Sequence, residues 1–544
     1  MPADPREILR TAASLLQSGR YVGAAGALRY ALDLAPTDAE VVSAIAQVSA
    51  RTRTLITLGR SQEALAVLAP LAESSHASGE LLMLCGYALM SLGRKDDAEA
   101  VLRRWAEQEP GNRDAAWRLA AALADNDKPV EAESVVRRDI AHRGSAAEAA
   151  FVLGRSLLGQ ARFDEAETEF RKVVQTKPDH QIAHSNLMEL VWMRTGDVDE
   201  ASHAIDMTLQ AYPMLRGLRI AKARLLTSAR MPQAALAEID AGLALDAQDP
   251  ALLKAAATIA LEFDGARALR YARRALSVVP HDRGALVAFG NASLAVGDVR
   301  QALDIAAKLH ALDPADGEAV AMQADALRIA GDPRYRELLD YRNFVQASYI
   351  DTPPGWPDLA GYLHDLQSAL TRAHTLHAHP IGNSLREGSQ IQLLPEQSES
   401  DAIRAFPSAI DEPIRRYMQA LGRGKDPMRS RNTGRYQMNG IWSVRLRPGG
   451  FHVSHYHPAG WISSACYLHL PAAVTRHGGE GWLKFGEPAF ATRATLGPEY
   501  FIKPEPGLLV LFPSYMWHGT VPFSGDTEEC RLTIAFDVVP VGAW

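Results

Sequence analysis

The chain has 544 residues, of which 47% are hydrophobic, so it is long enough for more than one domain with a packed core. Its 57 basic and 64 acidic residues give a formal charge of -7, which argues against nucleic acid as a partner. The N-terminus lacks the pattern of a secretory signal, no apolar stretch is long enough to span a membrane, and the three cysteines form no CxxC pair. We therefore expect a soluble, cytoplasmic protein that binds neither membranes nor nucleic acid.

The first two thirds of the chain repeat one unit, which can be aligned on a small residue. A proline follows this residue by twelve positions in six of the units. The aligned alanines lie 40, 34, 34, 34, 35, 34, 33 and 34 residues apart, at Ala24, Ala64, Ala98, Ala132, Ala166, Ala201, Ala235, Ala268 and Ala302. This is the period of the tetratricopeptide repeat (TPR), in which a small residue lets paired helices approach closely. We predict an all-α solenoid of about nine repeats over residues 1–345.

Two features of this solenoid follow from the repeat pattern. The first interval is longer than the others, which predicts an insertion or an atypical helix near Ser49 to Thr57. The concave face of such a solenoid suits a peptide or protein partner. The sequence leaves open a second role, in which the repeats only stiffen the chain or assemble it into a homo-oligomer.

A segment rich in proline separates the repeats from the remaining chain. The run from Asp351 to Pro357 contains adjacent prolines and a glycine, which cannot continue a helix. We place a linker at residues 346–357 and a second domain at 358–544. Within that domain we expect helices from Leu359 to Leu376 and from Ala402 to Leu421, and mainly strands after about Tyr436.

Three histidines of the second domain have the spacing of a metal site. His455 and His457 share one face if they lie in a strand. His518 follows the apolar run Leu508 to Phe512, which predicts a buried strand that ends in a turn. Three ligands on one face leave the opposite positions open for a substrate and oxygen. Another His-x-His, His377 to His379, follows a predicted helix, where such residues do not face each other, so we do not expect metal there.

An arginine close to the C-terminus predicts an anionic ligand beside this metal site. The run Arg531 to Phe536 alternates as a half-buried strand does, so Arg531 and Thr533 share a face. A guanidinium inside an apolar barrel needs an anionic partner, and its fork matches the two oxygens of a carboxylate. A dicarboxylic cosubstrate would supply that partner.

Together these motifs resemble the superfamily of 2-oxoglutarate- and Fe(II)-dependent dioxygenases. Its double-stranded β-helix carries His-x-Asp/Glu, a distal His and an Arg-x-Ser/Thr pair. The stretch from Asn383 to Thr533 is similar to a bacterial oxygenase family that is often fused to TPRs, through the motifs Asn383 to Gly388, His455 to Pro458, Gly460 to Ser463, Tyr467-Leu468, Pro506 to Ser514, Trp517-His518 and Arg531 to Thr533. The implied architecture is multidomain: an all-α TPR solenoid, then a double-stranded β-helix (jelly-roll) domain with buttressing helices.

The resemblance also implies the cofactors and the roles of the site residues. Fe(II) would be held by His455, His457 and His518, and O2 would be a cosubstrate. 2-Oxoglutarate would place its distal carboxylate on Arg531 and Thr533, with Tyr467 as a further hydrogen-bond donor. The implied activity is hydroxylation of a peptide or protein side chain.

The ligand set departs from that of most members, because His457 stands where they carry Asp or Glu. Three neutral imidazoles are also the ligands of thiol dioxygenases, which do not use 2-oxoglutarate, and imidazole suits zinc, nickel and copper as well. We favour the 2-oxoglutarate-dependent enzyme because of Arg531. A thiol oxygenase, or a TPR scaffold with a catalytically silent cupin domain, stays open. We expect His452, His469 and His477 to be surface or structural residues.

Overall fold

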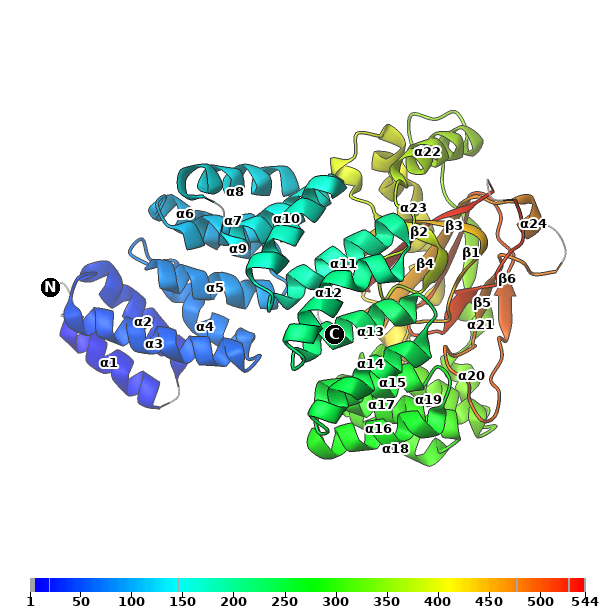
Figure 1. Cartoon of the computed structure of the whole chain (residues 1–544), viewed down its shortest axis with the longest axis horizontal. Coiled ribbons are helices and arrows are strands. Elements are labelled where there is room, and N and C mark those ends of the chain that lie inside the picture. The colour runs from blue at the N-terminus through cyan, green and yellow to red at the C-terminus, as the bar shows by residue number, and fades with distance from the viewer. Residues whose placement is uncertain (1–4, 19, 145, 476–477, 527–528, 543–544) are drawn as a thin grey trace. The chain divides into compact units, whose positions relative to one another are not determined.

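The computed structural model describes residues 5–18, 20–144, 146–475, 478–526 and 529–542. Among them no helix is long and apolar enough to cross a membrane, and His477 lies outside them. Contacts divide the chain into two compact units, Met1–Leu187 and Met188–Trp544 (Figure 1). The division falls within helix α11 (Gln181–Thr195), inside the repeats.

The first unit consists of helices that follow one another in antiparallel pairs. The aligned alanines of its repeats are buried, as the packing of paired helices requires. Side chains of Asp38, Ser78 and Asn112 cap the first turns of α3, α5 and α7. The helices are α1 (Pro5–Gln17), α2 (Tyr21–Leu34), α3 (Ala39–Thr57), α4 (Ser61–Ala72), α5 (Gly79–Ser91), α6 (Lys95–Gln108), α7 (Arg113–Asp125), α8 (Pro129–Arg143), α9 (Ala147–Gly159) and α10 (Phe163–Thr176).

Helix α3 explains the long first interval of the repeat. It has 19 residues, whereas its neighbours α2 and α4 have 14 and 12. The predicted atypical helix near Ser49 to Thr57 is therefore the extended C-terminal part of α3.

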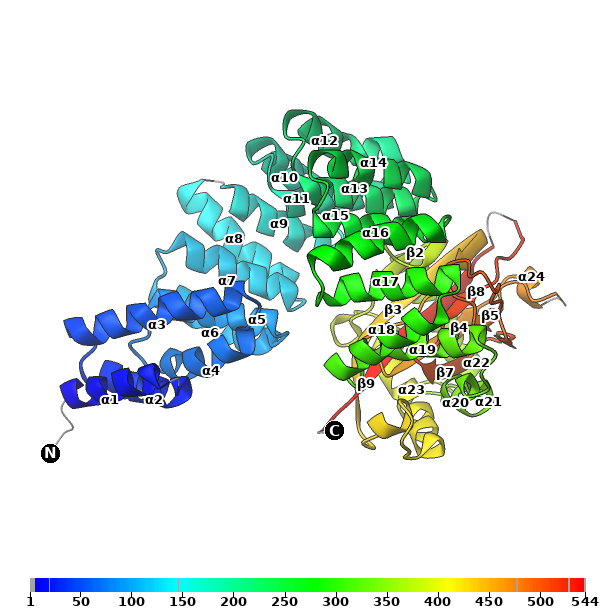
Figure 2. The ribbon, with the colours of Figure 1, turned by 90° about the horizontal axis from the view of Figure 1, so that it is seen from below.

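The second unit begins with the remaining repeats, whose helix pairs lie side by side in Figure 2. Aspartate side chains accept hydrogen bonds from the first turns of α12, α15, α16, α17, α18 and α19, which fixes where these helices begin. The helices are α12 (Val198–Ala211), α13 (Arg216–Ser228), α14 (Pro232–Leu245), α15 (Pro250–Ala260), α16 (Gly265–Val278), α17 (Arg283–Val296), α18 (Val299–Leu312) and α19 (Gly317–Ile329), followed by the short α20 (Tyr335–Leu338) and α21 (Tyr341–Phe344).

Two antiparallel sheets follow the repeats and form the predicted double-stranded β-helix. The larger has the strand order β1-β7-β4-β9-β3-β2 and the smaller β6-β5-β8. Residues 346–349, which we had assigned to the linker, form the edge strand β1. The strands are β1 (Gln346–Tyr349), β2 (Leu385–Gln392), β3 (Tyr436–His452), β4 (Ile462–His469), β5 (Leu483–Phe485), β6 (Tyr500–Ile502), β7 (Leu508–Pro513), β8 (His518–Thr520) and β9 (Arg531–Pro540).

Helices α22 (Leu359–Ala373) and α23 (Asp401–Leu421) cover the larger sheet, as the resemblance implied. Phe406 of α23 meets Phe536 of β9 edge to face, at 6.2 Å between ring centroids. Strand β9 is thus buried on both faces, whereas its alternation had predicted a half-buried strand. The second face is buried because it faces a cavity. The smaller elements are α24 (Ala472–Thr475), η1 (Pro395–Gln397) and η2 (Arg429–Arg431).

Candidate active site

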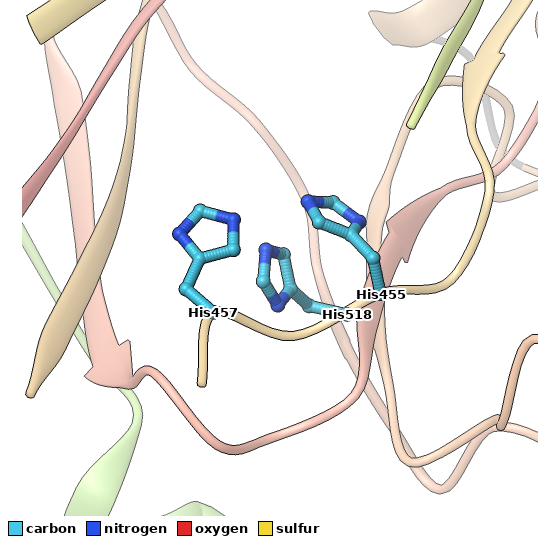
Figure 3. A group of neighbouring side chains, drawn as sticks. All are labelled: His455, His457 and His518. Carbon is cyan, nitrogen blue, oxygen red and sulfur yellow. The ribbon is translucent and has the colours of Figure 1, made fainter. Parts of the chain in front are cut away.

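The three histidines predicted from the sequence lie together (Figure 3). Each of His455, His457 and His518 offers one ring nitrogen, and these atoms lie within 4.8 Å of one another. The backbones of His455 and His518 exchange two hydrogen bonds of 2.9 Å, which fixes one ligand pair. The amide of His457 donates to the carbonyl oxygen of Ser514 at 2.8 Å. Such a group suits one metal ion.

The backbone of the His-x-His segment differs from the expected strand. Strand β3 ends at His452, and residues 453–457 form an irregular segment in which His455 makes an isolated bridge. The side chain between the two histidines, Tyr456, packs instead against the last repeats. His455 and His457 therefore point to one side and Tyr456 to the other, as they would in a strand, although these residues form no regular strand.

Each imidazole has its Nδ1 atom occupied by an acceptor. The Nδ1 atom of His455 lies 2.9 Å from the carbonyl oxygen of Val453, and that of His518 lies 3.0 Å from the carbonyl oxygen of Met516. The Nδ1 atom of His457 lies 2.6 Å and 2.8 Å from the two carboxylate oxygens of Asp537. With the proton on Nδ1, the lone pair of Nε2 is available to a metal ion.

Asp537 supplies the negative charge that the histidine triad lacks. Its carboxylate also accepts a hydrogen bond of 2.6 Å from the hydroxyl of Ser463, which is in turn 2.9 Å from Ser514 Oγ. A carboxylate on the far side of an imidazole fixes the ring and makes it a stronger ligand. Sequence reasoning missed this residue, although its place six positions after Arg531 puts it on the same face of β9.

Burial keeps the imidazoles of His455 and His518 neutral, as ligation requires. Burial, with a smaller effect of His457, lowers the pKa of His455 to about 3. Burial also holds the pKa of His518 well below its usual value. A neutral ring needs no deprotonation before it binds a metal ion.

Arg531 lies on the adjoining part of β9 without an anionic partner. It is 2% exposed, and its guanidinium carbon is 5.0 Å from the centre of the Tyr467 ring. No carboxylate of the described residues forms an ion pair with it, and its Nε atom and the Tyr467 hydroxyl are both buried without a hydrogen bond. Burial accordingly lowers the pKa of Arg531. The position thus fits a bound carboxylate, which would take up these unused donors.

One cavity of about 800 Å³ joins these groups. The three histidines, Arg531 and Thr533 line it, whereas Tyr467 lies behind Arg531 and does not. The opposite wall comes from the repeats, through helices α13 and α15. A cavity of this size holds a small molecule or an extended segment of chain, not a folded domain.

His452, for which we expect a surface or structural role, also lines this cavity. The hydroxyl of Ser384 lies 3.0 Å from Nδ1 of His452 and 3.2 Å from Nε2 of His455. His452 lies three and five residues before the pair, so the alternation of a regular strand would place it on the other face. The irregular backbone after β3 brings it to the cavity instead. His374, three residues before the His377 to His379 pair, lies between the hydroxyls of Ser389 and Ser443, at 2.8 Å and 2.9 Å.

Comparison with known families agrees with this arrangement. Residues 440–537 match the family described as "Putative 2OG-Fe(II) oxygenase". Residues 55–123, 118–181 and 151–215 match tetratricopeptide repeat families. The chain joins tetratricopeptide repeats to an oxygenase-family domain. Among curated proteins, none matches the chain.

Solved structures resemble the repeats only distantly. A tetratricopeptide repeat protein from Parabacteroides merdae is 14% identical, with a TM-score of 0.34 over 47% of this chain and 98% of its own. MamA from Desulfovibrio magneticus is 22% identical, with a TM-score of 0.27 over 31% and 94%. PilW, a type IV pilus biogenesis factor, is 20% identical, with a TM-score of 0.31 over 38% and 98%. Similarities this low support no functional argument.

The second domain contacts the last repeat next to two of the candidate metal ligands. Tyr456, between two of the histidines, donates a hydrogen bond of 3.3 Å to Glu318 of α19. Trp517, which precedes His518, donates one of 2.7 Å to Asp325 of the same helix. The two aromatic rings meet edge to face at 4.5 Å. The segments that carry the histidines therefore depend on α19 for their position.

Proposed function

We propose that the chain is an Fe(II)- and 2-oxoglutarate-dependent dioxygenase that hydroxylates a peptide or protein side chain. The observation that carries this proposal is Arg531, a buried cation without an anionic partner in the cavity that holds the histidine triad. A dicarboxylate cosubstrate would satisfy it, and the triad would hold the iron. The matching oxygenase family supports both cofactors.

In this proposal the protein supplies binding, orientation and exclusion of water. His455, His457 and His518 would hold Fe(II), and Asp537 would orient the ring of His457. Arg531 and Thr533 would bind the distal carboxylate of 2-oxoglutarate, with Tyr467 behind the guanidinium. When bound, the iron and 2-oxoglutarate supply oxidative chemistry that converts O2, 2-oxoglutarate and a substrate C–H group to succinate, CO2 and an alcohol.

The repeat helices that line the cavity favour a peptide or protein substrate. Helices α13 and α15 of the repeats form one wall, so a segment held by the repeats would lie next to the histidines. TPRs commonly bind peptides and proteins. The cytoplasmic location and the possible homo-oligomer stay predictions from the sequence.

The experiment that tests the function is anaerobic loading of the full chain with Fe(II) and 2-oxoglutarate. The bidentate complex has a weak visible charge-transfer band, which we expect in the wild type and expect Arg531→Met to weaken strongly at equal 2-oxoglutarate. Arg435→Met, at an exposed position of the same domain, is the matched control. Bound iron without the band in the wild type would reject 2-oxoglutarate as cosubstrate.

The two alternatives predict different results in the same proteins. A thiol dioxygenase needs no carboxylate site, so Arg531→Met would leave oxygen consumption on small thiols intact. A silent cupin on a repeat scaffold would retain zinc and bind partners equally with and without 2-oxoglutarate. The unpaired Arg531 argues against both, because neither alternative gives its buried charge a partner.

A further inference from the structure

Two arginines of the cavity wall, one from the repeats and one from the larger sheet, form no ion pair with a carboxylate of the described residues. Arg224 of α13 and Arg386 of β2 both line the cavity. Among the described residues, neither forms an ion pair with a carboxylate. The other three cations of α13 are paired: Arg216 with Asp249, Arg219 with Glu238, and Lys222 with Asp206. The unpaired cation of this helix is therefore the one that faces the cavity.

Both guanidinium groups reach the same short segment before β2. Arg386 donates hydrogen bonds of 2.7 Å and 2.8 Å to the carbonyl oxygens of Asn383 and Leu385 through Nη1. Nη2 of Arg224 comes so close to Gly382 that a Cβ atom there would lie only 2.9 Å away. Gly382 also has a φ of +84°, so this residue permits both the turn and the approach of the arginine. The two cations thus flank one loop.

The loop itself is fixed to the repeats, so the arginines have a defined setting. The amide of Gly382 donates to the hydroxyl of Ser228 at 2.9 Å, and the amide of Ile381 donates to Glu189 at 3.1 Å. The indole of Trp192 donates to the carbonyl oxygen of His379 at 2.8 Å. A rigid setting reduces the entropy lost when a ligand binds.

One acid, Glu262, lines the same end of the cavity from the turn after α15. Burial raises its pKa, and the charge of Arg386 opposes that rise. The two side chains nevertheless form no ion pair with each other. Glu189 is the acid beside Arg224, and burial raises its pKa too. A raised pKa weakens the negative charge of both carboxyls, so the two arginines are left to attract an anion that Glu262 partly repels.

We propose that Arg224 and Arg386 form a subsite for a carboxylate of the substrate, supplied by an aspartate or glutamate side chain of an extended peptide. This rests on the proposed function and names the substrate class for the same cavity. Arg531 is separate from it, because it lies on β9 and would hold the cosubstrate. A guanidinium pair suits a carboxylate through charge-assisted hydrogen bonds. The acidic residue would anchor the peptide on the repeats while a neighbouring side chain reaches the histidines.

The test begins with selection of short random peptides on the full chain loaded with Mn(II) and N-oxalylglycine, which support binding but no turnover. We expect the selected peptides to be rich in aspartate and glutamate. Synthetic copies should bind at least about tenfold more weakly to Arg224→Met and to Arg386→Met, the loss expected for a charged hydrogen bond. Glu262→Gln should bind them a few times more tightly, because it removes a repulsion.

Arg273→Met is the matched control, because Arg273 is an exposed repeat arginine outside the cavity. Its affinity should equal that of the wild type. Arg386 also holds the loop through two hydrogen bonds, so its replacement costs stability as well as binding. Arg224 is exposed, so its replacement tests binding alone. Selected peptides without acidic residues, or unchanged binding to Arg224→Met, would overturn the proposal.

Two further readouts separate the possible failures. N-acetylaspartate carries the same carboxylate as an acidic peptide, and it should compete only weakly; strong competition would assign the subsite to a small organic acid and overturn the peptide assignment. The charge-transfer band with Fe(II) and 2-oxoglutarate should persist in Arg224→Met. A wild type without that band would contradict the proposed function itself, whereas a wild type with the band and no acidic preference would contradict only the subsite.

Discussion

The indole nitrogen of Trp517 donates a hydrogen bond of 2.7 Å to Oδ2 of Asp325, which links the segment that carries one histidine of the triad to the last TPR helix. The next residue along the chain is His518. Both partners are buried, and the other carboxylate oxygen of Asp325 has no hydrogen-bond partner among the described residues. The position of one histidine of the triad thus depends on a polar contact inside the repeat core.

Replacing Trp517 by Phe is expected to weaken metal binding. The ring would still pack on the repeats, but Asp325 would lose its donor, which costs about 1–3 kcal/mol in a buried site. If the segment moves so that Asp325 regains a hydrogen-bond partner, His518 moves with it. We expect the affinity for Co(II), measured by competition with a chelating dye, to fall several-fold. Trp356→Phe is the control, because it removes an indole-to-carboxylate hydrogen bond at residues that do not line the cavity. Equal affinities in the two variants would contradict the dependence.

Asp325 also predicts how stability changes with pH. Burial raises its pKa from 3.8 to about 7. Between these two pH values the carboxyl of Asp325 is therefore protonated in the folded chain and ionised in the unfolded chain. The resulting contribution to stability is complete below about pH 4 and is lost as the pH rises through about 7. Asp325→Asn keeps an acceptor for Trp517 and removes the titration. Its stability relative to the wild type should therefore increase with pH, by up to a few kcal/mol (~1.4 kcal/mol per unit).

Denaturant unfolding of the full chain at about pH 5 and about pH 8 measures this difference. Asp365→Asn is a control, because Asp365 accepts a hydrogen bond from the indole of Trp356 at an exposed site. A difference between Asp325→Asn and the wild type that is the same at both pH values would show that this carboxyl does not titrate in that range.

Replacing Asp537 by Asn is also expected to lower the affinity for a metal ion. Asp537→Asn keeps an oxygen for Nδ1 of His457 but removes the negative charge, so the imidazole becomes a weaker ligand. Loss of such a partner lowers metal affinity by about 10–100-fold. The same Co(II) competition measures it, again with Asp365→Asn as control. Full affinity in Asp537→Asn would mean that the triad binds metal without help from this carboxylate.

The sequence predicted the parts of the site that local periodicity determines. The alternation along residues 531–536 put Arg531 and Thr533 on one face, and the apolar run 508–512 predicted β7 ahead of His518. Asp537 was missed because the alternation was not followed beyond Phe536. Arg224 and Arg386 were beyond prediction, because their shared cavity depends on how a repeat helix packs against a strand 162 residues further along the chain, as the residue numbers give it. No local pattern encodes that packing.

Tyr467→Phe is expected to change stability and cosubstrate binding in opposite directions. The hydroxyl of Tyr467 is buried without a hydrogen bond in the ligand-free chain, so its removal should raise stability by about 1 kcal/mol, the lower end of the cost of an unsatisfied group. If the hydroxyl donates to the distal carboxylate of 2-oxoglutarate, the variant should bind the cosubstrate several-fold more weakly. Thermal unfolding with and without Mn(II) and 2-oxoglutarate measures both effects, because ligand binding raises Tm by an amount that grows with the logarithm of the ratio of ligand concentration to Kd. We expect a higher Tm for the variant alone and a smaller increase on adding 2-oxoglutarate. An equal increase in both proteins would remove Tyr467 from the cosubstrate site and leave it as the ring on which Arg531 rests.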